Sequence, residues 1–277
     1  MINKIESPMN ADFTPAGGAL AALDLLSIGI AGDIAHVRLN RPGKRNAIND
    51  TLIAQIQSCF ATLAEPVRAV VLSGAGEHFC AGLDLSEMSE RDVFEGIAHS
   101  RQWHAAMDQV QFGRLPVVAV LQGAVVGGGL ELASSAHIRV AEDSAFFGLP
   151  EGQRGLFVGG GGAARVPRLI GFSRMTDMML TGRVLDADEG QAAGLTHYRV
   201  RDGEGLARGI EIARRIAANA PLSNYAVMQA LPRIAQAPQG EGLFIESLMA
   251  AIAQGDPAAK QRMRDFIEKR AAKVSKA

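Results

Sequence analysis

Short runs of aliphatic residues recur along the first half of the chain. Each is four or five residues long and most are rich in β-branched side chains, as expected of buried strands. The runs are residues 35–39, 69–72, 117–121 and 138–141. Longer segments, 50–64 and 86–112, separate the first three runs, and the apolar positions of segment 50–64 recur at helical spacing. Strands that alternate with helices predict an α/β fold.

The chain after residue 173 has a mainly helical pattern. Residues 205–220 form an amphipathic segment, and Pro221 suits the first turn of a following helix. Two more helices are predicted over residues 239–253 and 256–273, the last opened by the cap Asp256 and a proline. We therefore divide the chain into a core over residues 23–200 and a helical region over residues 201–277.

The predicted helix over residues 239–253 carries a group of large apolar side chains. They are Leu243, Phe244, Ile245, Leu248 and Met249. A contiguous apolar patch of this kind usually marks an interface between chains. The periodicity alone equally allows this helix to fold back on its own core.

Residues 1–22 mix Pro, Gly, Ser and Asn without periodicity, which predicts a loose N-terminal extension. This segment has no continuous apolar stretch and carries Glu6 and Asp12, so we do not interpret it as a signal or transit peptide. The most apolar stretch, residues 115–132, is interrupted by glycines and polar residues, which argues against a membrane span. We expect a cytoplasmic protein with no membrane partner.

Composition narrows the range of partners and cofactors. The net charge is −1 over 277 residues, so no broad attraction to nucleic acid is expected. The two cysteines, Cys59 and Cys80, form no disulfide framework, and no Cys/His cluster has metal-ligand spacing. We expect no metal ion, and a reducing compartment is the simpler interpretation.

Two glycine-rich turns each lead from a predicted strand into a helix, over residues 73–85 and 122–133. Backbone N–H groups at such turns and helix starts lack partners, and two of them converging would form an oxyanion hole. The alternative is a pair of tight structural connections. Neither turn matches a dinucleotide-binding fingerprint or a Walker loop.

Several segments, taken together in their order and spacing, resemble the enoyl-CoA hydratase (crotonase) family. The resemblance covers about residues 23–271. Its segments are residues 40–42, 46–47, 79–85, 127–133, 150–151, the glycine run 159–162, 166–171 and 266–270. The combination is specific for the family, but much less so for one reaction.

The resemblance implies a spiral of ββα units and a helical C-terminal region that trimerises, often with pairing of trimers into hexamers. It implies that the N–H groups of Leu83 and Gly128 form the oxyanion hole and that Glu131 and Glu151 are catalytic. Four further positions are expected to bind substrate, namely Ala81, Gly82, Asp84 and Gly127. No separate cofactor is implied, because coenzyme A is part of the acyl-CoA substrate.

The residues themselves support the two glutamates in part. Glu131 lies in an otherwise apolar helix start, where a desolvated carboxylate is costly without a purpose or partner. The alternative is a first-turn acid favoured by the helix dipole. Glu151 follows a proline in a loop and could equally be a plain surface acid. Beside Glu131 and the glycine-rich turns, it is favoured as the second member of an acid–base pair.

The sequence also gives expectations for several other positions. The chain departs from the family at Val158, where many members have proline, which leaves the acyl preference open, and at Ala136-His137, which we assign to packing. We expect Asp84 to cap the helix after its loop. Cys80 has no matching His and Asp, so packing is favoured over nucleophilic catalysis. Basic side chains within residues 41–45 are expected to meet the nucleotide phosphates.

The leading hypothesis is hydration of a 2-enoyl-CoA thioester, as in fatty acid metabolism. Within the family the alternatives are an enoyl-CoA isomerase, an acyl-CoA hydrolase or an aromatic enoyl-CoA hydratase-lyase. From another class, the alternative is a non-catalytic acyl-CoA-binding subunit, against which the presence of both glutamates argues. No basic stripe with interleaved aromatic residues favours RNA binding.

Overall fold

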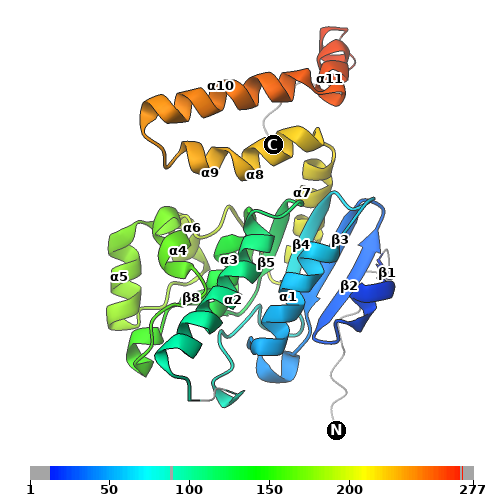
Figure 1. Cartoon of the computed structure of the whole chain (residues 1–277). Coiled ribbons are helices and arrows are strands. Elements are labelled where there is room, and N and C mark those ends of the chain that lie inside the picture. Colours follow the sequence, from blue (N-terminus) through cyan, green and yellow to red (C-terminus); the bar gives the residue numbers. More distant parts are fainter. Residues whose placement is uncertain (1–12, 88–89, 269, 271–277) are drawn as a thin grey trace. The chain divides into compact units, whose positions relative to one another are not determined.

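The computed structural model describes residues 13–87, 90–268 and 270 (Figure 1). The chain divides into two compact units, Met1–Arg215 and Ile216–Ala277. The predicted helical region began at residue 201, whereas most of helix α7 (Gly205–Ala217) groups with the first unit. Each unit is described by itself below.

The first unit is built on a seven-stranded sheet in the order β1-β2-β3-β4-β5-β7-β9. The strands from β3 onward run parallel, whereas β1 and β2 are antiparallel to their neighbours. All four predicted strands are confirmed with shifts of at most two residues at their ends. The strands are β1 (Thr14–Pro15), β2 (Leu26–Ala31), β3 (Ile34–Leu39), β4 (Ala69–Gly74), β5 (Val117–Leu121), β7 (Ile138–Glu142) and β9 (Tyr198–Val200).

A second, two-stranded sheet pairs β6 (Ala124–Val126) with β8 (Phe146–Gly148) in parallel. The chain therefore passes from a strand of the large sheet to a strand of the small sheet and then to a helix, first through β5, β6 and α3 (Gly128–Ser135). The same order recurs through β7 and β8. This is the repeating ββα arrangement that the sequence led us to expect, so the predicted fold class is confirmed.

Helices α1 and α2 pack against each other beside the sheet (Figure 1). Helix α1 (Asp50–Thr62) is capped by Asn49, whose side chain accepts a hydrogen bond from Leu52 N at 2.9 Å. Its buried face carries the apolar residues that predicted it. The remaining helices of this unit are α4 (Gly162–Ile170), α5 (Phe172–Thr181) and α6 (Ala187–Ala193), with short 3₁₀ turns η1 (Gly18–Ala22), η2 (Pro42–Lys44), η3 (Leu85–Glu87) and η4 (Glu151–Arg154).

The prediction of one long helix over residues 86–112 was wrong at its start. Helix α2 spans Val93–Gln111, and Leu85–Glu87 form the separate turn η3. The start is fixed by a capping box, because the Asp92 side chain accepts from Glu95 N at 2.8 Å and the Glu95 carboxylate accepts from Asp92 N at 2.9 Å. These reciprocal bonds stabilise the first turn at that point.

Residues 13–22 are not loose, contrary to the prediction for the N-terminal extension. Strand β1 pairs with β2, and Phe13 is buried with its ring packed edge-on against His36 at 5.6 Å between centroids. Leu20 also packs against the core. Residues 1–12, the remainder of the predicted extension, lie outside the described residues.

The second unit is helical, as predicted. Pro221 begins α8 at its first turn, and the Asp256 side chain caps α11 by accepting hydrogen bonds from the N–H groups of residues 258 and 259. The helices are α8 (Pro221–Gln229), α9 (Leu231–Ile234), α10 (Gln239–Gly255) and α11 (Pro257–Ile267). The part of the predicted last helix beyond residue 267 does not continue as helix in the described residues.

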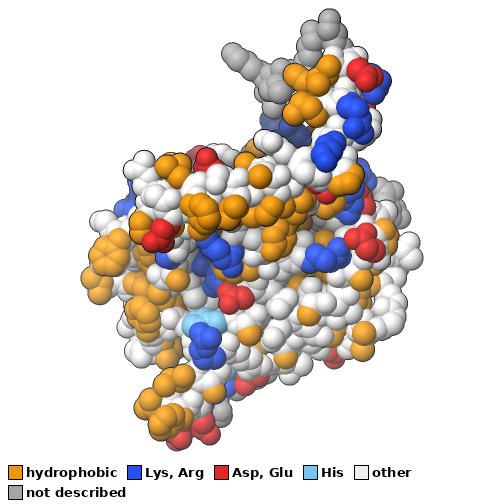
Figure 2. All heavy atoms as spheres, turned by 45° about the horizontal axis from the view of Figure 1, so that its top comes forward, with side chains coloured by type: hydrophobic (Ala, Val, Ile, Leu, Met, Phe, Trp, Pro, Cys, Tyr) orange, Lys and Arg blue, Asp and Glu red, His pale blue; other side chains and the backbone are white. Residues whose placement is uncertain are grey.

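Helix α10 exposes much of its apolar side-chain surface. Leu243, Phe244 and Leu248 are exposed, and Figure 2 shows hydrophobic side chains in orange on the C-terminal helices that face the viewer. Ile245 and Met249 are partly buried. An unpartnered apolar surface is typical of an interface, so the predicted assembly into trimers or hexamers stays a prediction.

Candidate active site

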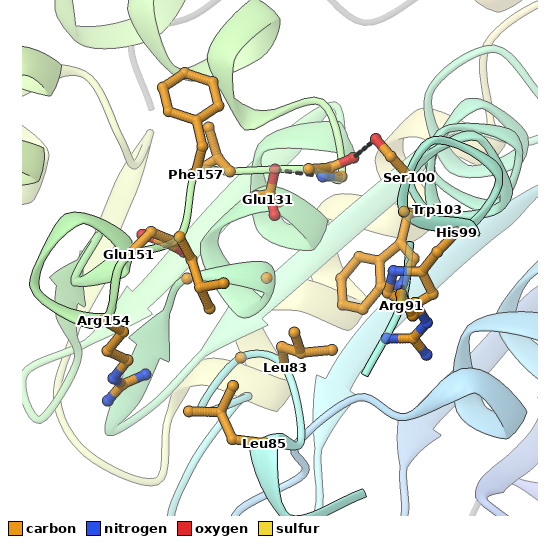
Figure 3. A pocket seen from close by; sticks show the side chains of 18 of the residues that line it. Leu83, Leu85, Arg91, His99, Ser100, Trp103, Glu131, Glu151, Arg154 and Phe157 are labelled. Atoms are coloured by element: carbon orange, nitrogen blue, oxygen red, sulfur yellow. Dashed lines mark hydrogen bonds between the residues drawn. The ribbon is translucent and has the colours of Figure 1, made fainter. Parts of the chain in front are cut away.

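A cavity of about 390 Å³ lies among α2, α3, η4 and the glycine-rich segment before α4 (Figure 3). Glu131 and Glu151 both face it, with Trp103 and His99 of α2 on another wall and Leu83 and Leu85 below. Its lining is mainly apolar, with a few polar groups that converge, which is the usual composition of a small-molecule site.

None of the helices within the described residues has the length and apolar character of a membrane span.

The two glycine-rich turns meet at this cavity. Gly82 has φ +97°, and an added Cβ there would lie 3.4 Å from Gly128 N and 2.8 Å from the Val126 carbonyl oxygen. A Cβ added at Gly128 would lie 3.5 Å from Leu83 N. The backbones therefore approach so closely that residue 82 has no room for a side chain.

The N–H groups of Leu83 and Gly128 are both available at this meeting point. Gly128 is the first residue of α3, so its N–H has no partner within the helix. Leu83 forms a bridge with Ile48, but the bonds of that bridge run from Ile48 N to Gly82 O and from Asp84 N to Ile48 O. Neither bond uses the Leu83 N–H. Two donors of this kind can bind one oxyanion.

Glu131 lies in the first turn of α3 and is only 3% exposed. Its Oε1 accepts hydrogen bonds from Gly160 N and Gly162 N, each at 2.8 Å. Burial raises the pKa of this carboxyl, and the two N–H donors oppose the rise. Glu131, which the sequence predicts at the start of a helix, is thus a desolvated carboxylate. The glycine run holds it through these two hydrogen bonds.

Glu151 is the first residue of η4 and lies opposite Gly127. A Cβ at Gly127 would lie 2.7 Å from Glu151 Oε1, so the missing side chain makes room for the carboxylate. Its Oε2 is buried without a hydrogen-bond partner in the described structure. Burial raises the pKa of Glu151, and the nearby Glu131 carboxylate adds to the rise. Two carboxyl groups with raised pKa values therefore border one cavity.

Three of the four residues predicted to bind substrate, Ala81, Gly82 and Gly127, line the cavity, but Asp84 is not among its lining residues. The Asp84 carboxylate lies 3.1 Å from Arg41 and accepts a hydrogen bond from Ser86 N at 3.1 Å. It thus stabilises the short turn η3 instead of capping the long helix. Arg41 and Lys44, which were expected to meet phosphate, are both ion-paired with Asp84, and Lys44 is exposed.

Helix α2 contributes several side chains to the cavity wall. The Trp103 ring lies against the α3 start, since a Cβ at Gly128 would come within 2.7 Å of it. Trp103 Nε1 donates to His99 Nε2 at 3.2 Å, which lies 2.9 Å from Asp50 Oδ1. Ser100 Oγ donates to the Gly159 carbonyl at 2.6 Å. The serine carried no motif signal, because its partner is 59 residues away.

Cys80 and His137 have the packed surroundings that the sequence predicts for them. Cys80 is fully buried, and burial raises the pKa of its thiol to about 12, which disfavours a thiolate nucleophile. His78 Nδ1 accepts a hydrogen bond from Ala124 N at 3.1 Å. His137 Nδ1 accepts one from Val117 N at 3.0 Å, and burial lowers its pKa to about 4. Val158 is buried and lines the cavity.

Comparison with known proteins points to one family. Residues 29–276 match the family model described as enoyl-CoA hydratase/isomerase. The chain is 32% identical to the enoyl-CoA hydratase EchA19 of Mycobacterium tuberculosis, covering 87% of this chain and 92% of the relative. It is 34% identical to the short-chain-enoyl-CoA hydratase of Clostridium acetobutylicum, covering 86% and 93%.

Solved structures extend the comparison to the fold. A candidate enoyl-CoA hydratase from Rhodopseudomonas palustris CGA009 is 52% identical, with a TM-score of 0.88 over 94% of this chain and 99% of that one. An enoyl-CoA hydratase from Bacillus anthracis is 30% identical, with a TM-score of 0.83 over 88% and 96%. The range matched by the family model, residues 29–276, includes both glycine-rich turns and both glutamates.

Proposed function

Because the chain belongs to the enoyl-CoA hydratase/isomerase family, we propose that it adds water across the 2,3 double bond of a 2-enoyl-CoA thioester. The observation that carries the proposal is the pair of carboxyl groups, Glu131 and Glu151, with raised pKa values on one cavity beside two converging N–H groups. Such a pair suits the division of acid and base roles at neutral pH.

In this reaction the thioester oxygen accepts hydrogen bonds from the N–H groups of Leu83 and Gly128. Negative charge grows on that oxygen as water adds to C3, because the electrons of the double bond shift toward the carbonyl. Preorganised donors stabilise this charge, and losing one such donor typically costs about 2.7–4 kcal/mol of barrier. The glycines at 82 and 127 serve this geometry by letting the backbone approach closely.

The two glutamates handle the protons. One carboxylate takes a proton from the attacking water as oxygen bonds to C3, and the other, protonated, gives a proton to C2. A raised pKa makes each group a better base when ionised and keeps the protonated form populated nearer neutral pH. The Glu131 carboxylate raises the pKa of Glu151, which favours a state with one group ionised and the other protonated, as a base and an acid require.

The other reactions of the family form different products, which distinguish them from hydration. An isomerase would interconvert 2- and 3-enoyl-CoA without a change of mass, and a hydrolase would release free CoA thiol. A second acidic group is what favours hydration, because moving a double bond requires only one carboxyl group to relocate a proton. A non-catalytic subunit would bind acyl-CoA without turnover.

Incubation with crotonyl-CoA tests the proposal. We expect loss of the enoyl thioester absorbance and a product heavier by the mass of one water, with no free thiol. The reverse reaction from 3-hydroxybutyryl-CoA should restore the absorbance. Absence of water addition with crotonyl-CoA and with longer 2-enoyl thioesters would overturn the proposal, and a mass-neutral shift with 3-enoyl-CoA would assign isomerisation.

We also propose that the enzyme acts as a homotrimer or hexamer. The exposed apolar side chains of α10, which include Leu243, Phe244 and Leu248, support an interface on this helix. The mass in solution tests this proposal, as developed in the Discussion.

A further inference from the structure

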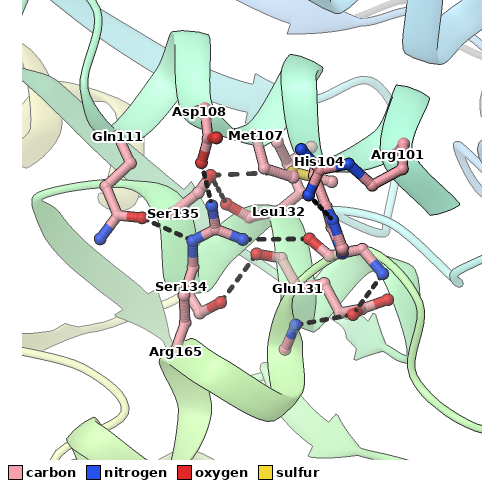
Figure 4. Close-up of polar contacts among 12 residues, drawn as sticks. Arg101, His104, Met107, Asp108, Gln111, Glu131, Leu132, Ser134, Ser135 and Arg165 are labelled. Carbon is pink, nitrogen blue, oxygen red and sulfur yellow. Dashed lines mark hydrogen bonds and ion pairs between the residues drawn. The ribbon is translucent and has the colours of Figure 1, made fainter.

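The catalytic candidate Glu131 is held by a loop that is in turn held by α2. Its two donors, Gly160 N and Gly162 N, both belong to the glycine run that precedes and begins α4. Glycines lack side chains that could fix this run from within. The orientation of its peptide groups must therefore come from contacts with neighbouring elements (Figure 4).

One of these contacts is made by Ser100. The peptide that links Gly159 and Gly160 presents its N–H to Glu131 Oε1 at 2.8 Å and its carbonyl to Ser100 Oγ at 2.6 Å. A peptide group is planar, so its C=O and N–H point in opposite directions. Ser100, the peptide and Glu131 thus form one chain of hydrogen bonds, in which each bond polarises the next.

The next peptide of the run is held by Arg165. Its guanidinium donates to the Gly160 carbonyl at 3.0 Å and also to Gln111 Oε1 at 2.6 Å and Asp108 Oδ1 at 2.8 Å, both on α2 (Figure 4). Figure 4 shows the guanidinium between α2 and the glycine run. The run is therefore fixed to α2 at two successive carbonyl groups.

We infer that Ser100 is a positioning residue, which holds the Gly159–Gly160 peptide so that its N–H is directed at Glu131, with Arg165 as the second anchor of the same run. The effect of Ser100 on catalysis rests on the proposed function, whereas its effect on the position of the Gly160 N–H does not. Ser100 and Gly159 are 59 residues apart in the chain, so this hydrogen bond forms only when the fold brings α2 and the glycine run together.

The titratable groups around Glu131 decide which variant is informative. Arg165 of α4 lies close enough to lower the pKa of Glu131 by its charge, and Glu151 of η4 faces it across the cavity. From α2, His104 lies beside Ser100, Asp108 is bonded to Arg165, and His99 lines the same cavity. Removing Arg165 would act on Glu131 through its charge as well as through the loop. Ser100 is neutral, so its removal isolates the positioning effect.

The decisive experiment compares Ser100→Ala with Ser100→Thr, which keeps the hydroxyl. We expect the alanine variant to lower kcat about 2- to 10-fold, the range of one neutral hydrogen bond, with KM unchanged. One apparent pKa of the pH–kcat profile should be absent in Glu131→Gln, and this pKa should rise in Ser100→Ala. Without the Ser100 hydroxyl, the Gly160 N–H is a weaker donor and stabilises the Glu131 carboxylate less. The threonine variant should restore both. Melting curves will show that each variant is folded.

A matched control separates positioning from general packing. Ser134 donates its hydroxyl to the backbone carbonyl of Glu131 at 2.7 Å and not to the glycine run, so Ser134→Ala should leave the apparent pKa that is assigned to Glu131 unchanged. Because His104 Nε2 lies 3.5 Å from Ser100 Oγ, the alanine variant is also prepared with His104→Ala, where the imidazole cannot replace the hydroxyl.

Direct titration of Glu131 makes the test independent of turnover. Its carboxyl carbon, identified by its loss in Glu131→Gln, is followed by NMR across pH in the wild type and in Ser100→Ala. A higher pKa in the alanine variant supports the inference, and an unchanged pKa in both alanine backgrounds overturns it. Absence of hydration by the wild type overturns the proposed function alone, since this titration still reports on Ser100.

Discussion

Replacing Gly162 by alanine should slow the enzyme markedly while leaving it folded. Gly162 begins α4, and its N–H is one of the two donors to Glu131. An added Cβ would lie 2.8 Å from Glu131 Cγ and 2.9 Å from Oε1, whereas ordinary van der Waals contact begins near 3.4 Å. The added Cβ is attached to the loop backbone, which shifts less easily than a side chain. The Glu131 carboxylate must therefore move by roughly half an ångström. Misplacement by about 1 Å can cost 10²-fold in rate, so we expect kcat to fall about 10-fold.

The stability change is too small to explain such a loss. Inserting a methyl group into a packed site typically costs about 1–3 kcal/mol, and alanine in place of glycine in a helix returns about 0.5–1 kcal/mol. The net loss of about 0–2.5 kcal/mol is well below the ~5–15 kcal/mol by which folded proteins are usually stable. At 25 °C the variant therefore stays folded, and its Tm should fall by less than about 10 °C.

The assay is steady-state hydration of crotonyl-CoA together with thermal melting. Gly17→Ala is the control, because Gly17 directly precedes η1, has a φ of −99° that alanine also adopts, and an added Cβ there meets nothing within 4 Å. It should leave kcat unchanged. Full kcat in Gly162→Ala would refute the reasoning, since it would mean that the position of Glu131 observed here is not the one that the reaction uses.

Four further predictions concern the two glutamates, the acyl-CoA ligand and the assembly. Glu131→Gln and Glu151→Gln should each lose about 10²- to 10⁴-fold in kcat while still binding acyl-CoA, and full activity in either would remove that residue from the mechanism. Because burial raises the folded-state pKa of Glu131, ionising it opposes folding above the ordinary pKa of about 4.3, so Glu131→Gln should melt higher than the wild type at pH 8, and the difference should shrink as the pH falls toward that value. CoA thioesters should bind far more tightly than the free enoic acids, and calorimetry that gives equal affinities would contradict the binding model. Light scattering at micromolar concentration should give a trimer or hexamer, and truncation after Gly240 should abolish both assembly and activity; a mass near the 29.2 kDa of one chain for the intact protein would contradict the assembly.

The parts of the fold that were predictable are those encoded by local pattern. The aliphatic runs of β3, β4, β5 and β7 are long enough to be recognised as buried strands. Strands β6 and β8 have three residues each, which is too short for an alternation to be read. The start of α2 was encoded locally, in Asp92 and Glu95, but the preceding polar residues were equally compatible with a helix.

The candidate site was predictable in its backbone and less so in its supports. The glycine-rich turns and Glu131 belong to continuous motifs, so their meeting at one cavity was expected. Ser100 and Arg165 act through hydrogen bonds to backbone groups of a distant loop, and such bonds leave no pattern in the sequence. Phe13 escaped notice for a similar reason, because its packing partner His36 lies on a strand that only the fold brings near.

Trp103 gives this protein a built-in optical reporter. It is the one tryptophan of the chain, and its ring is 4% exposed in the cavity wall beside the start of α3. Indole fluorescence is sensitive to nearby charge and polarity. Because the chain has one tryptophan, all of its tryptophan fluorescence comes from this site. Ligand entry, rotation of the glycine run or ionisation of Glu131 can thus be followed in rapid-mixing experiments on the unlabelled protein.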